Sequence, residues 1–182
     1  DLGYSPVTGK VLLKDYLIEW LDRHSRELKP NTAKQYQYKI NKFVIPIIGD
    51  KKLEDLSLPQ MDYYYSSLLK KGYGIRSVRY VHQILHKAFE DAIKYGYIIR
   101  NPSHGATLPR IPQKEMMILE EYQVSSFLIA AKCSKLEALF HLAIVTGMRQ
   151  GELFGLKWVD IQWQRGVLYV KRQAIPIKGQ GV

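Results

Sequence analysis

The chain has 182 residues, of which 46% are hydrophobic and 24% charged, a composition typical of folded domains that excludes a disordered chain. No apolar run approaches the roughly 20 residues of a membrane-spanning helix, and the first residues lack a secretory signal pattern. The single cysteine excludes an internal disulfide, so we expect a cytoplasmic protein with no membrane partner. The net charge of +10 predicts attraction to polyanions such as nucleic acids.

The chain begins with residues 1–10, which lack helical periodicity and are expected to be a linker or an artificial chain end. Apolar residues then recur every three or four positions from Leu13 to Leu28, which predicts a helix with one buried stripe. Pro30 should end this helix because proline disrupts a helix interior.

A second helix is predicted to start at Thr32, which has the spacing of a capping box with Gln35. Pro46 should distort its last turn, and Gly49 should stop it. The residues expected to be buried are Tyr36, Ile40, Phe43 and Ile47.

A third helix is predicted to start with a similar capping box at Ser57 to Gln60 and to end at Gly72. The fourth helix has the clearest apolar stripe and should be capped by Gly96. Its stripe consists of Val78, Val81, Leu85, Ala88, Ala92 and Tyr95. Prolines from Pro102 to Pro112 predict a linker, so we expect one domain over residues 11–110 and a second over residues 111–182.

The second domain should contain helices over residues 119–131 and 136–145 and a short helix from Arg149 to Leu156. Residues 167–170 are β-branched and aromatic and predict a strand. No partner strand is evident before it, so we expect its hairpin to continue after Val182 and the domain to be truncated.

Two rows of polar side chains lie beside the apolar stripes of the second and fourth helices and contain no acidic residue. The first basic row consists of Lys34, Gln35, Tyr38 and Lys42. The second basic row consists of Arg76, Arg79, Tyr80, Gln83 and Lys87. Lysine and arginine suit phosphates, and glutamine and tyrosine can reach base edges or sugars, so both rows are candidate double-stranded DNA contacts. The alternative is an ordinary solvated helix face.

Three consecutive tyrosines at residues 63–65 invite a base-stacking interpretation. Consecutive helical residues point in different directions, so at most one or two of them share a face. A role in the core is therefore the favoured interpretation.

The segment from Leu142 to Ile161 predicts a helix that breaks at Gly147 and a new short helix that begins at Arg149. Unpaired backbone N–H groups and the helix dipole favour an anion there, and the guanidinium of Arg149 can bind two phosphate oxygens at once. Glu152 lies one turn later and can orient that guanidinium, while Leu153, Leu156 and Trp158 should fix the short helix to the core. The alternative is an ordinary surface ion pair at a tight corner.

The pattern Thr-Gly-Met-Arg-x-x-Glu-Leu-x-x-Leu-x-Trp-x-Asp-Ile over residues 146–161 resembles the first-arginine motif of tyrosine recombinases. Upstream, Thr32 with Tyr36, residues 45–49 and residues 98–102 resemble the core-binding domain of the same family. The similarity extends from Leu12 to Val182, and the integrases of phages and integrative elements are the best-fitting branch.

The resemblance implies a mainly α fold, with a four-helix SAM-like core-binding domain followed by the truncated start of a mixed α/β catalytic domain. It also implies site-specific DNA recombination through a 3′-phosphotyrosine intermediate, with no metal or cofactor and with assembly into a tetramer on DNA. Arg149 matches the first catalytic arginine of the family, and Glu152 matches the supporting acidic position.

The sequence also departs from the family pattern. None of the five histidines is followed by arginine three positions later, so the second cluster, His-x-x-Arg, is absent. The tyrosine nucleophile of the family follows that cluster, so none of the 13 tyrosines occupies its position. We therefore expect a chain that is inactive alone. Two alternatives stay open: a non-catalytic or degenerate integrase that only binds DNA, and a helix-turn-helix regulator.

Overall fold

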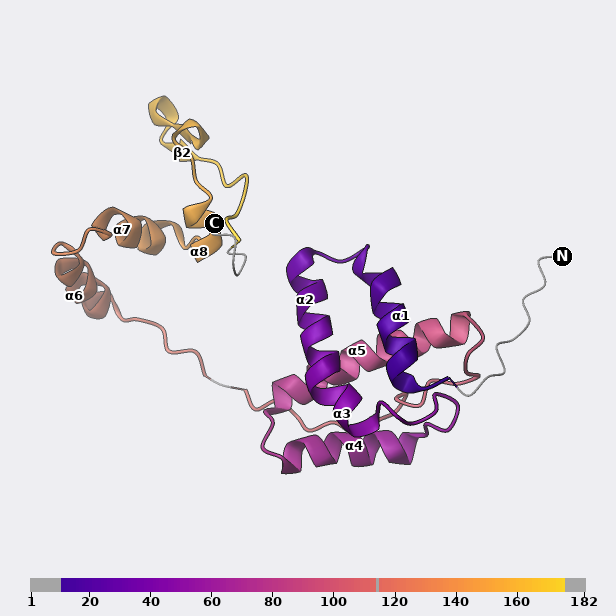
Figure 1. Cartoon of the computed structure of the whole chain (residues 1–182). Helices are drawn as coiled ribbons and strands as arrows, with labels where there is room; N and C mark the ends of the chain where they lie inside the picture. Colours follow the sequence, from indigo (N-terminus) through magenta and orange to yellow (C-terminus); the bar gives the residue numbers. More distant parts are fainter. Residues whose placement is uncertain (1–10, 114, 176–182) are drawn as a thin grey trace. The chain divides into compact units, whose positions relative to one another are not determined.

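The computed structural model describes residues 11–113 and 115–175, and its contacts divide the chain into two compact units between residues 113 and 114 (Figure 1). The described chain is mainly helical, with a single two-stranded sheet. The expectations for residues 1–10 and for a hairpin turn near Val182 lie outside the described residues.

The first unit begins with α1 (Leu13–Ser25), in which the predicted stripe is buried from Leu13 to Trp20 but only half-buried at Leu21 and His24. The helix ends before Leu28 and Pro30. α2 (Pro30–Lys39) starts earlier than predicted, with Pro30 in its first turn. The predicted capping box at Thr32 is wrong: Thr32 already lies inside the helix, where its N–H donates to the carbonyl of Lys29 at 2.9 Å. Proline restricts its own φ to helical values, which explains the earlier start.

The helix is distorted just before Pro46, as predicted. α2 continues into a π-helical turn at Ile40–Val44, closed by a hydrogen bond from the N–H of Ile45 to the carbonyl of Ile40. α3 (Ile45–Ile48) then holds Pro46 in its first turn and ends at Gly49. A Cβ at Gly49 would lie 2.5 Å from the carbonyl oxygen of Ile45, so glycine is needed there for space.

The other half of this unit consists of α4 (Leu58–Lys70) and α5 (Ile75–Lys94). Gly72 and Gly96 follow the two helices with φ of 82° and 75°, a left-handed conformation that favours glycine. The second predicted capping box is also wrong: Ser57 is the N-cap of α4 but makes no side-chain capping hydrogen bond. Proline again occupies the first turn of the helix.

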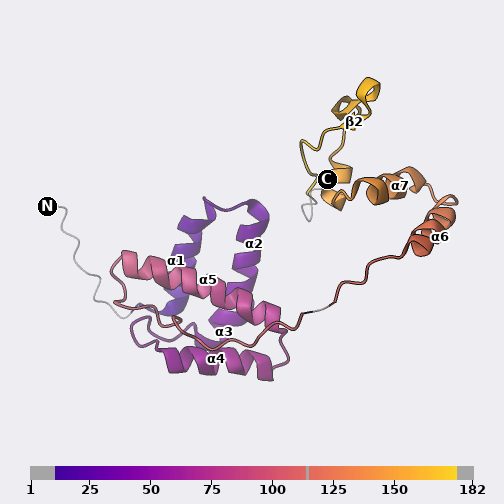
Figure 2. The same ribbon diagram turned by 180° about the vertical axis from the view of Figure 1, so that it is seen from behind.

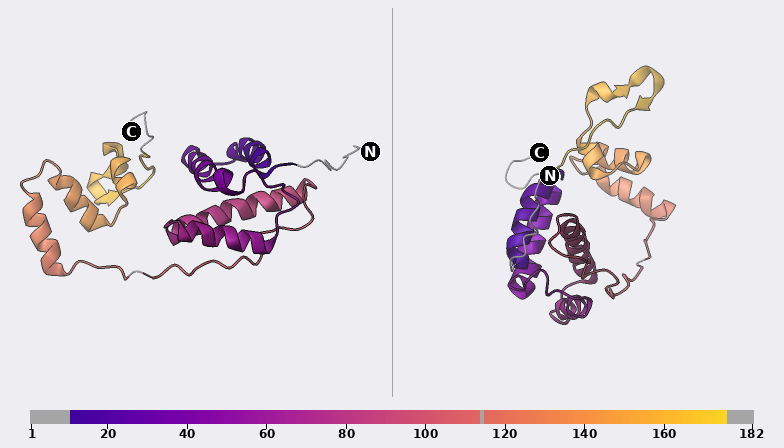
Figure 3. Two further views of the ribbon diagram at one scale, coloured as in Figure 1. Left: turned by 60° about the horizontal axis from the view of Figure 1, so that its bottom comes forward. Right: turned by 90° about the vertical axis from the view of Figure 1, so that its right-hand side faces the viewer.

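The core of the first unit lies between the α1–α2 pair and the α4–α5 pair, which form two layers (Figure 3, left). Ile40 and Phe43 are buried as predicted, and Tyr36 and Ile47 are half-buried. In the tyrosine run, Tyr64 and Tyr65 are buried, which confirms their core role. The α5 stripe is buried except at its last member: Tyr95 is 44% exposed, because the helix ends at Lys94 and the periodicity no longer applies.

The segment after α5 runs back along α4 and α5 (Figure 2). Asn101 is 9% exposed and donates to the carboxylate of Glu90 at 2.6 Å, so the beginning of the predicted linker is packed rather than free. Further on, the N–H of Thr107 donates to Asp62 at 2.8 Å, and Arg79 donates to the carbonyl of Pro109 at 3.0 Å. These contacts fix the segment to the first unit as far as Pro109.

The second unit contains α6 (Glu121–Ala131), α7 (Glu137–Thr146) and α8 (Gln150–Phe154). Two short 3-10 turns then flank β1 (Ile161–Gln162), which pairs antiparallel with β2 (Val167–Leu168). The expectation that this strand lacks an earlier partner is wrong: a strand of two residues is too short to show an alternating pattern in the sequence.

Candidate nucleic-acid interface and the Arg149 corner

The corner before Arg149 is built by a glycine and a threonine. α7 ends at Thr146, and Gly147 has a φ of 65°, which reverses the chain direction at no steric cost. The hydroxyl of Thr146 donates to the carbonyl of Leu142 at 2.5 Å and accepts the N–H of Met148 at 3.3 Å. These contacts make the break between α7 and α8 a defined turn, with Arg149 at the N-cap of α8.

Glu152 holds Arg149 from both its backbone and its side chain. Its carboxylate accepts the N–H of Arg149 at 2.9 Å and the guanidinium at 3.0 Å. Backbone and side-chain hydrogen bonds from Arg149, in that order, hold the pKa of the Glu152 carboxyl below its ordinary value. The Arg149 side chain remains 85% exposed, so most of its donors stay available to a ligand.

This geometry corrects two details of the prediction. The N–H of Arg149 is already bonded to Glu152, so an anion at this corner would depend on the guanidinium rather than on that backbone donor. Trp158 was expected to pack into the core but is 79% exposed and stacks on Trp163 with ring centroids 6.2 Å apart. Leu153 and Leu156 are half-buried and take the larger part in packing.

Three members of the first basic row lie on α2 and Lys42 lies on the π-helical turn that follows, and all four side chains are exposed. The ammonium of Lys42 donates to the hydroxyl of Tyr38 at 2.7 Å. This hydrogen bond lowers the pKa of Tyr38 and raises the pKa of Lys42. The ammonium of Lys42 therefore keeps its positive charge and its hydrogen-bond donors.

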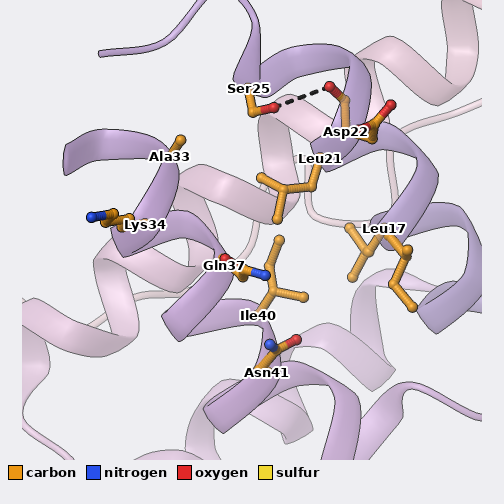
Figure 4. A pocket seen from close by; sticks show the side chains of 10 residues that line it. Leu17, Leu21, Asp22, Ser25, Ala33, Lys34, Gln37, Ile40 and Asn41 are labelled. Atoms are coloured by element: carbon orange, nitrogen blue, oxygen red, sulfur yellow. Dashed lines mark hydrogen bonds between the residues drawn. The ribbon is translucent and has the colours of Figure 1, made fainter. Parts of the chain in front are cut away.

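Lys34 lies at the edge of a groove between α1 and α2. The groove is lined by apolar side chains that include Leu17, Leu21 and Ile40. Figure 4 shows the Lys34 ammonium pointing away from those side chains. Lys34 therefore directs its charge to the outer side of α2 and does not fill the groove.

The second basic row on α5 is divided. Arg76 and Gln83 are exposed, whereas Arg79 binds the carbonyl of Pro109 and Lys87 pairs with Asp91 at 3.1 Å. Tyr80 is half-buried and packs edge-on against Tyr36, with centroids 5.9 Å apart. Two of the predicted cations in this row thus have protein partners already.

Asp91 lies at the centre of a cluster that the sequence analysis did not identify. Its carboxylate accepts the indole N–H of Trp20 at 3.0 Å and ammonium groups from Lys87 and Lys94 at 3.1 and 3.2 Å. Burial works to raise the pKa of Asp91, but these hydrogen bonds outweigh burial and hold it below its ordinary value. The spacing of Lys87, Asp91 and Lys94 along one helix was a signal for these ion pairs.

Lys39 is a further candidate that the sequence analysis missed. Its ammonium donates to the hydroxyl of Ser77 at 3.1 Å and lies 4.8 Å from the ring centroid of Phe43. Together with the Tyr36–Tyr80 contact, this bond joins α2 to the first turns of α5. These contacts form a seam between α2 and the first turns of α5, and the second basic row starts beside this seam.

Two further classes of site receive no support in residues 11–113 and 115–175. Within these ranges no group of three or more His, Cys, Asp or Glu side chains could hold a metal ion. No helix there has the length and apolar composition needed to cross a membrane.

Known proteins provide the remaining comparison. The family model described as phage integrase, N-terminal SAM-like domain, matches residues 12–69. A tyrosine recombinase XerC-like protein of Caldanaerobacter subterraneus subsp. tengcongensis is 30% identical over 94% of this chain and 45% of its own length. The integrase of Enterobacteria phage 434 is 30% identical over 96% of this chain and 50% of its own length. The chain thus spans half or less of the length of these relatives.

Solved structures agree on the fold. The Tn1549 transposon integrase, in complex with circular intermediate DNA, matches with a TM-score of 0.81 and 22% identity, over 94% of this chain and 57% of the other. A lambda integrase dimer bound to a COC′ core site matches with a TM-score of 0.71 and 26% identity, over 94% and 66% of the two chains.

In fold class the chain is therefore an integrase-type protein. A SAM-like helical bundle precedes, in the sequence, a second unit in which Arg149 lies at the turn between α7 and α8. Over nearly its whole length the chain is similar to tyrosine recombinases and integrases, and its residues 12–69 match the SAM-like domain of phage integrases.

Proposed function

We propose that this chain is the DNA-binding domain and the first part of the catalytic domain of a site-specific tyrosine recombinase. Residues 11–110 would bind double-stranded DNA, and residues 111–182 would begin the catalytic domain. The observation that carries the proposal is an exposed guanidinium, that of Arg149, held by Glu152 at a defined helical corner. The names of the relatives, recombinases and integrases, support the same function.

In the proposed reaction a tyrosine attacks the scissile phosphate, forms a 3′-phosphotyrosine and releases the 5′-hydroxyl of the cleaved strand. A 5′-hydroxyl of the partner DNA later attacks the same phosphate and displaces that tyrosine. Negative charge develops on the phosphoryl oxygens in each transition state. The planar guanidinium of Arg149 can donate two hydrogen bonds to those oxygens, and its bond to Glu152 keeps the guanidinium directed outward. No metal or nucleotide is required, because the phosphotyrosine bond conserves the energy of the cleaved linkage.

DNA would lie against the seam between α2 and α5 and contact both basic rows. Lys34, Lys42 and Arg76 are exposed and would neutralise phosphates directly. Gln35, Tyr38, Tyr80 and Gln83 would contact sugars or base edges. Arg79 and Lys87 would contribute less, because each already has a protein partner.

The proposed catalytic steps need a longer polypeptide than this chain. The sequence has no His-x-x-Arg cluster, and its relatives are about twice as long. The second unit also exposes large apolar side chains such as Phe154 and Val145, whereas Ala131 is its only buried apolar residue among those described. We expect the remaining catalytic residues to follow in the longer protein, with tetramer assembly on DNA and no strand exchange by this chain alone.

The decisive experiment replaces Arg149 with lysine in the full-length polypeptide and measures cleavage of a suicide DNA substrate. Cleavage should fall about 10²–10³-fold while DNA binding is retained, because one ammonium cannot reproduce the bidentate fork. Arg165→Lys is the matched control, since Arg165 is exposed in the same unit but belongs to the 3-10 turn Trp163–Arg165 and not to α8. Unchanged cleavage would remove Arg149 from the chemistry.

The competing candidate is an integrase relative that binds DNA without cutting it. It predicts that no covalent protein–DNA adduct survives denaturation of the full-length protein after incubation with its site. A trapped adduct on the 3′ phosphate would exclude this candidate.

A further inference from the structure

The chain segment Arg172–Ala174 returns to α8 and lies directly against its backbone. A Cβ at Gly151 would lie 2.9 Å from the carbonyl oxygen of Ala174, and a Cβ at Gly155 would lie 2.8 Å from that of Arg172. The N–H of Ala174 donates to the carbonyl of Gly151 at 2.7 Å. Gly151 lies in α8 and Gly155 directly follows the helix; they are four residues apart, so they lie on the same side, and only glycine allows this close approach.

A buried carboxylate anchors the other end of this segment. Asp160 is 1% exposed and accepts two hydrogen bonds from the guanidinium of Arg172 and one from the N–H of Lys157 at 3.0 Å. Its own carbonyl accepts the N–H of Tyr169 at 2.9 Å. Asp160 therefore joins the end of the α8 region, the β1–β2 hairpin and the returning segment.

The orientation of Arg149 depends on α8. Arg149 donates two hydrogen bonds to the carboxylate of Glu152, which lies within the helix. A helix as short as α8, Gln150–Phe154, is not stable on its own, so contacts with other parts of the chain must hold it. The returning segment makes such contacts on the side of α8 that carries its glycines.

We propose that Arg172, through Asp160 and the glycine side of α8, is a positioning residue for the guanidinium of Arg149. The consequence for catalysis rests on the proposed function of Arg149. Arg172 would not contact the scissile phosphate; it would fix the helix from which Arg149 reaches that phosphate. Catalytic groups must keep their position closely, since a displacement of about 1 Å costs roughly 10²-fold in rate.

The first test measures the titration of the Glu152 carboxyl by ¹³C NMR in the 182-residue chain. In the wild type its pKa is depressed by the bonds from Arg149. Arg172→Gln and Gly155→Ala should each raise this pKa toward the value of an unpaired glutamate, because α8 loses its support. Arg172→Lys keeps a positive charge beside Asp160 and should restore part of the depression.

The matched control is Gly74→Ala, where φ is −64° and no atom lies within 4 Å of an added Cβ. It should leave the Glu152 titration unchanged. If Arg172 only stabilised its own hairpin, Arg172→Gln and Arg172→Lys would also leave that titration unchanged, and the proposal would be wrong. Should Arg172→Gln unfold the second unit, the milder Arg172→Lys decides the question alone.

The second test measures cleavage and DNA binding by the full-length polypeptide. Arg172→Gln should slow suicide-substrate cleavage about 10²-fold with binding changed less than about twofold. Equal losses of cleavage and binding would overturn the positioning role. If the Glu152 titration shifts but neither Arg149→Lys nor Arg172→Gln slows cleavage, the coupling through α8 stands and the proposed catalytic role of Arg149 is refuted.

Discussion

The exposed cations beside the α2–α5 seam should control how DNA binding depends on salt. Each phosphate that a cation neutralises releases counterions and contributes about 0.9 to the slope of log K against log salt. Replacing Lys34, Lys42 or Arg76 with alanine should each remove one such contribution, because all three side chains are exposed. When salt rises from 50 to 200 mM, the affinity of a single variant for DNA should fall by a factor about 3.5 times smaller than that of the wild type. For the triple variant the factor should be about 40 times smaller.

The assay is fluorescence anisotropy with a labelled DNA duplex over this range of salt. A duplex of arbitrary sequence suffices, because the phosphate contribution does not depend on sequence. Arg79→Ala and Lys87→Ala should each lower the slope by less, since these cations bind Pro109 and Asp91.

Arg100→Ala is the control. Arg100 is exposed and follows the C-terminal end of α5, whereas Arg76 lies in the first turn of this 20-residue helix. The reasoning is refuted if the triple variant keeps the wild-type slope, or if Arg100→Ala lowers the slope as much as Arg76→Ala does.

Three further predictions concern the stability of the first unit. Leu85→Ala should destabilise it by about 2–5 kcal/mol in urea unfolding, because Leu85 is 0% exposed; a loss below about 1 kcal/mol would contradict this. Tyr64→Phe should cost about 1 kcal/mol in the same assay, because it removes the hydrogen bond to the carbonyl of Phe43 at 3.0 Å, and an unchanged midpoint would argue against that bond. Because its pKa is depressed in the folded state, ionised Asp91 stabilises the fold at pH values above the ordinary aspartate pKa, and this stability is lost as pH falls through the folded-state pKa. Asp91→Asn should therefore flatten the acid side of the profile of thermal stability against pH. A profile as steep as that of the wild type would count against the cluster.

The helices could be predicted because their apolar residues repeat with the helical period. The stripe from Val78 to Ala92 is buried throughout, and the helix break at Gly147 lies where glycine allows a left-handed turn. Helix starts were less predictable, because a proline in the first turn competes with a capping residue nearby: α2 begins at Pro30 rather than at Thr32.

Contacts between distant residues could not be predicted from local patterns. The partner of Arg79 is Pro109, 30 positions later, and Asp160 meets Arg172 across a hairpin of two-residue strands. The Arg149–Glu152 contact was predictable, because both residues lie within one helical turn.

The π-helical turn at Ile40–Val44 has a consequence for how this protein tolerates changes in length. A π-helical turn contains one residue more than an α-helical turn, and each residue of an α-helix advances the chain by about 100°. Deleting one residue there would let the backbone close into a regular helix with its hydrogen bonds intact. Because the π-helical turn accommodates its extra residue by widening, the shortened α-helical turn would carry the chain almost equally far around the axis, and Lys34 and Tyr38 would keep nearly the same direction relative to α3. A one-residue deletion within α2 itself would instead rotate the residues before it by about 100° and redirect the polar side of the helix.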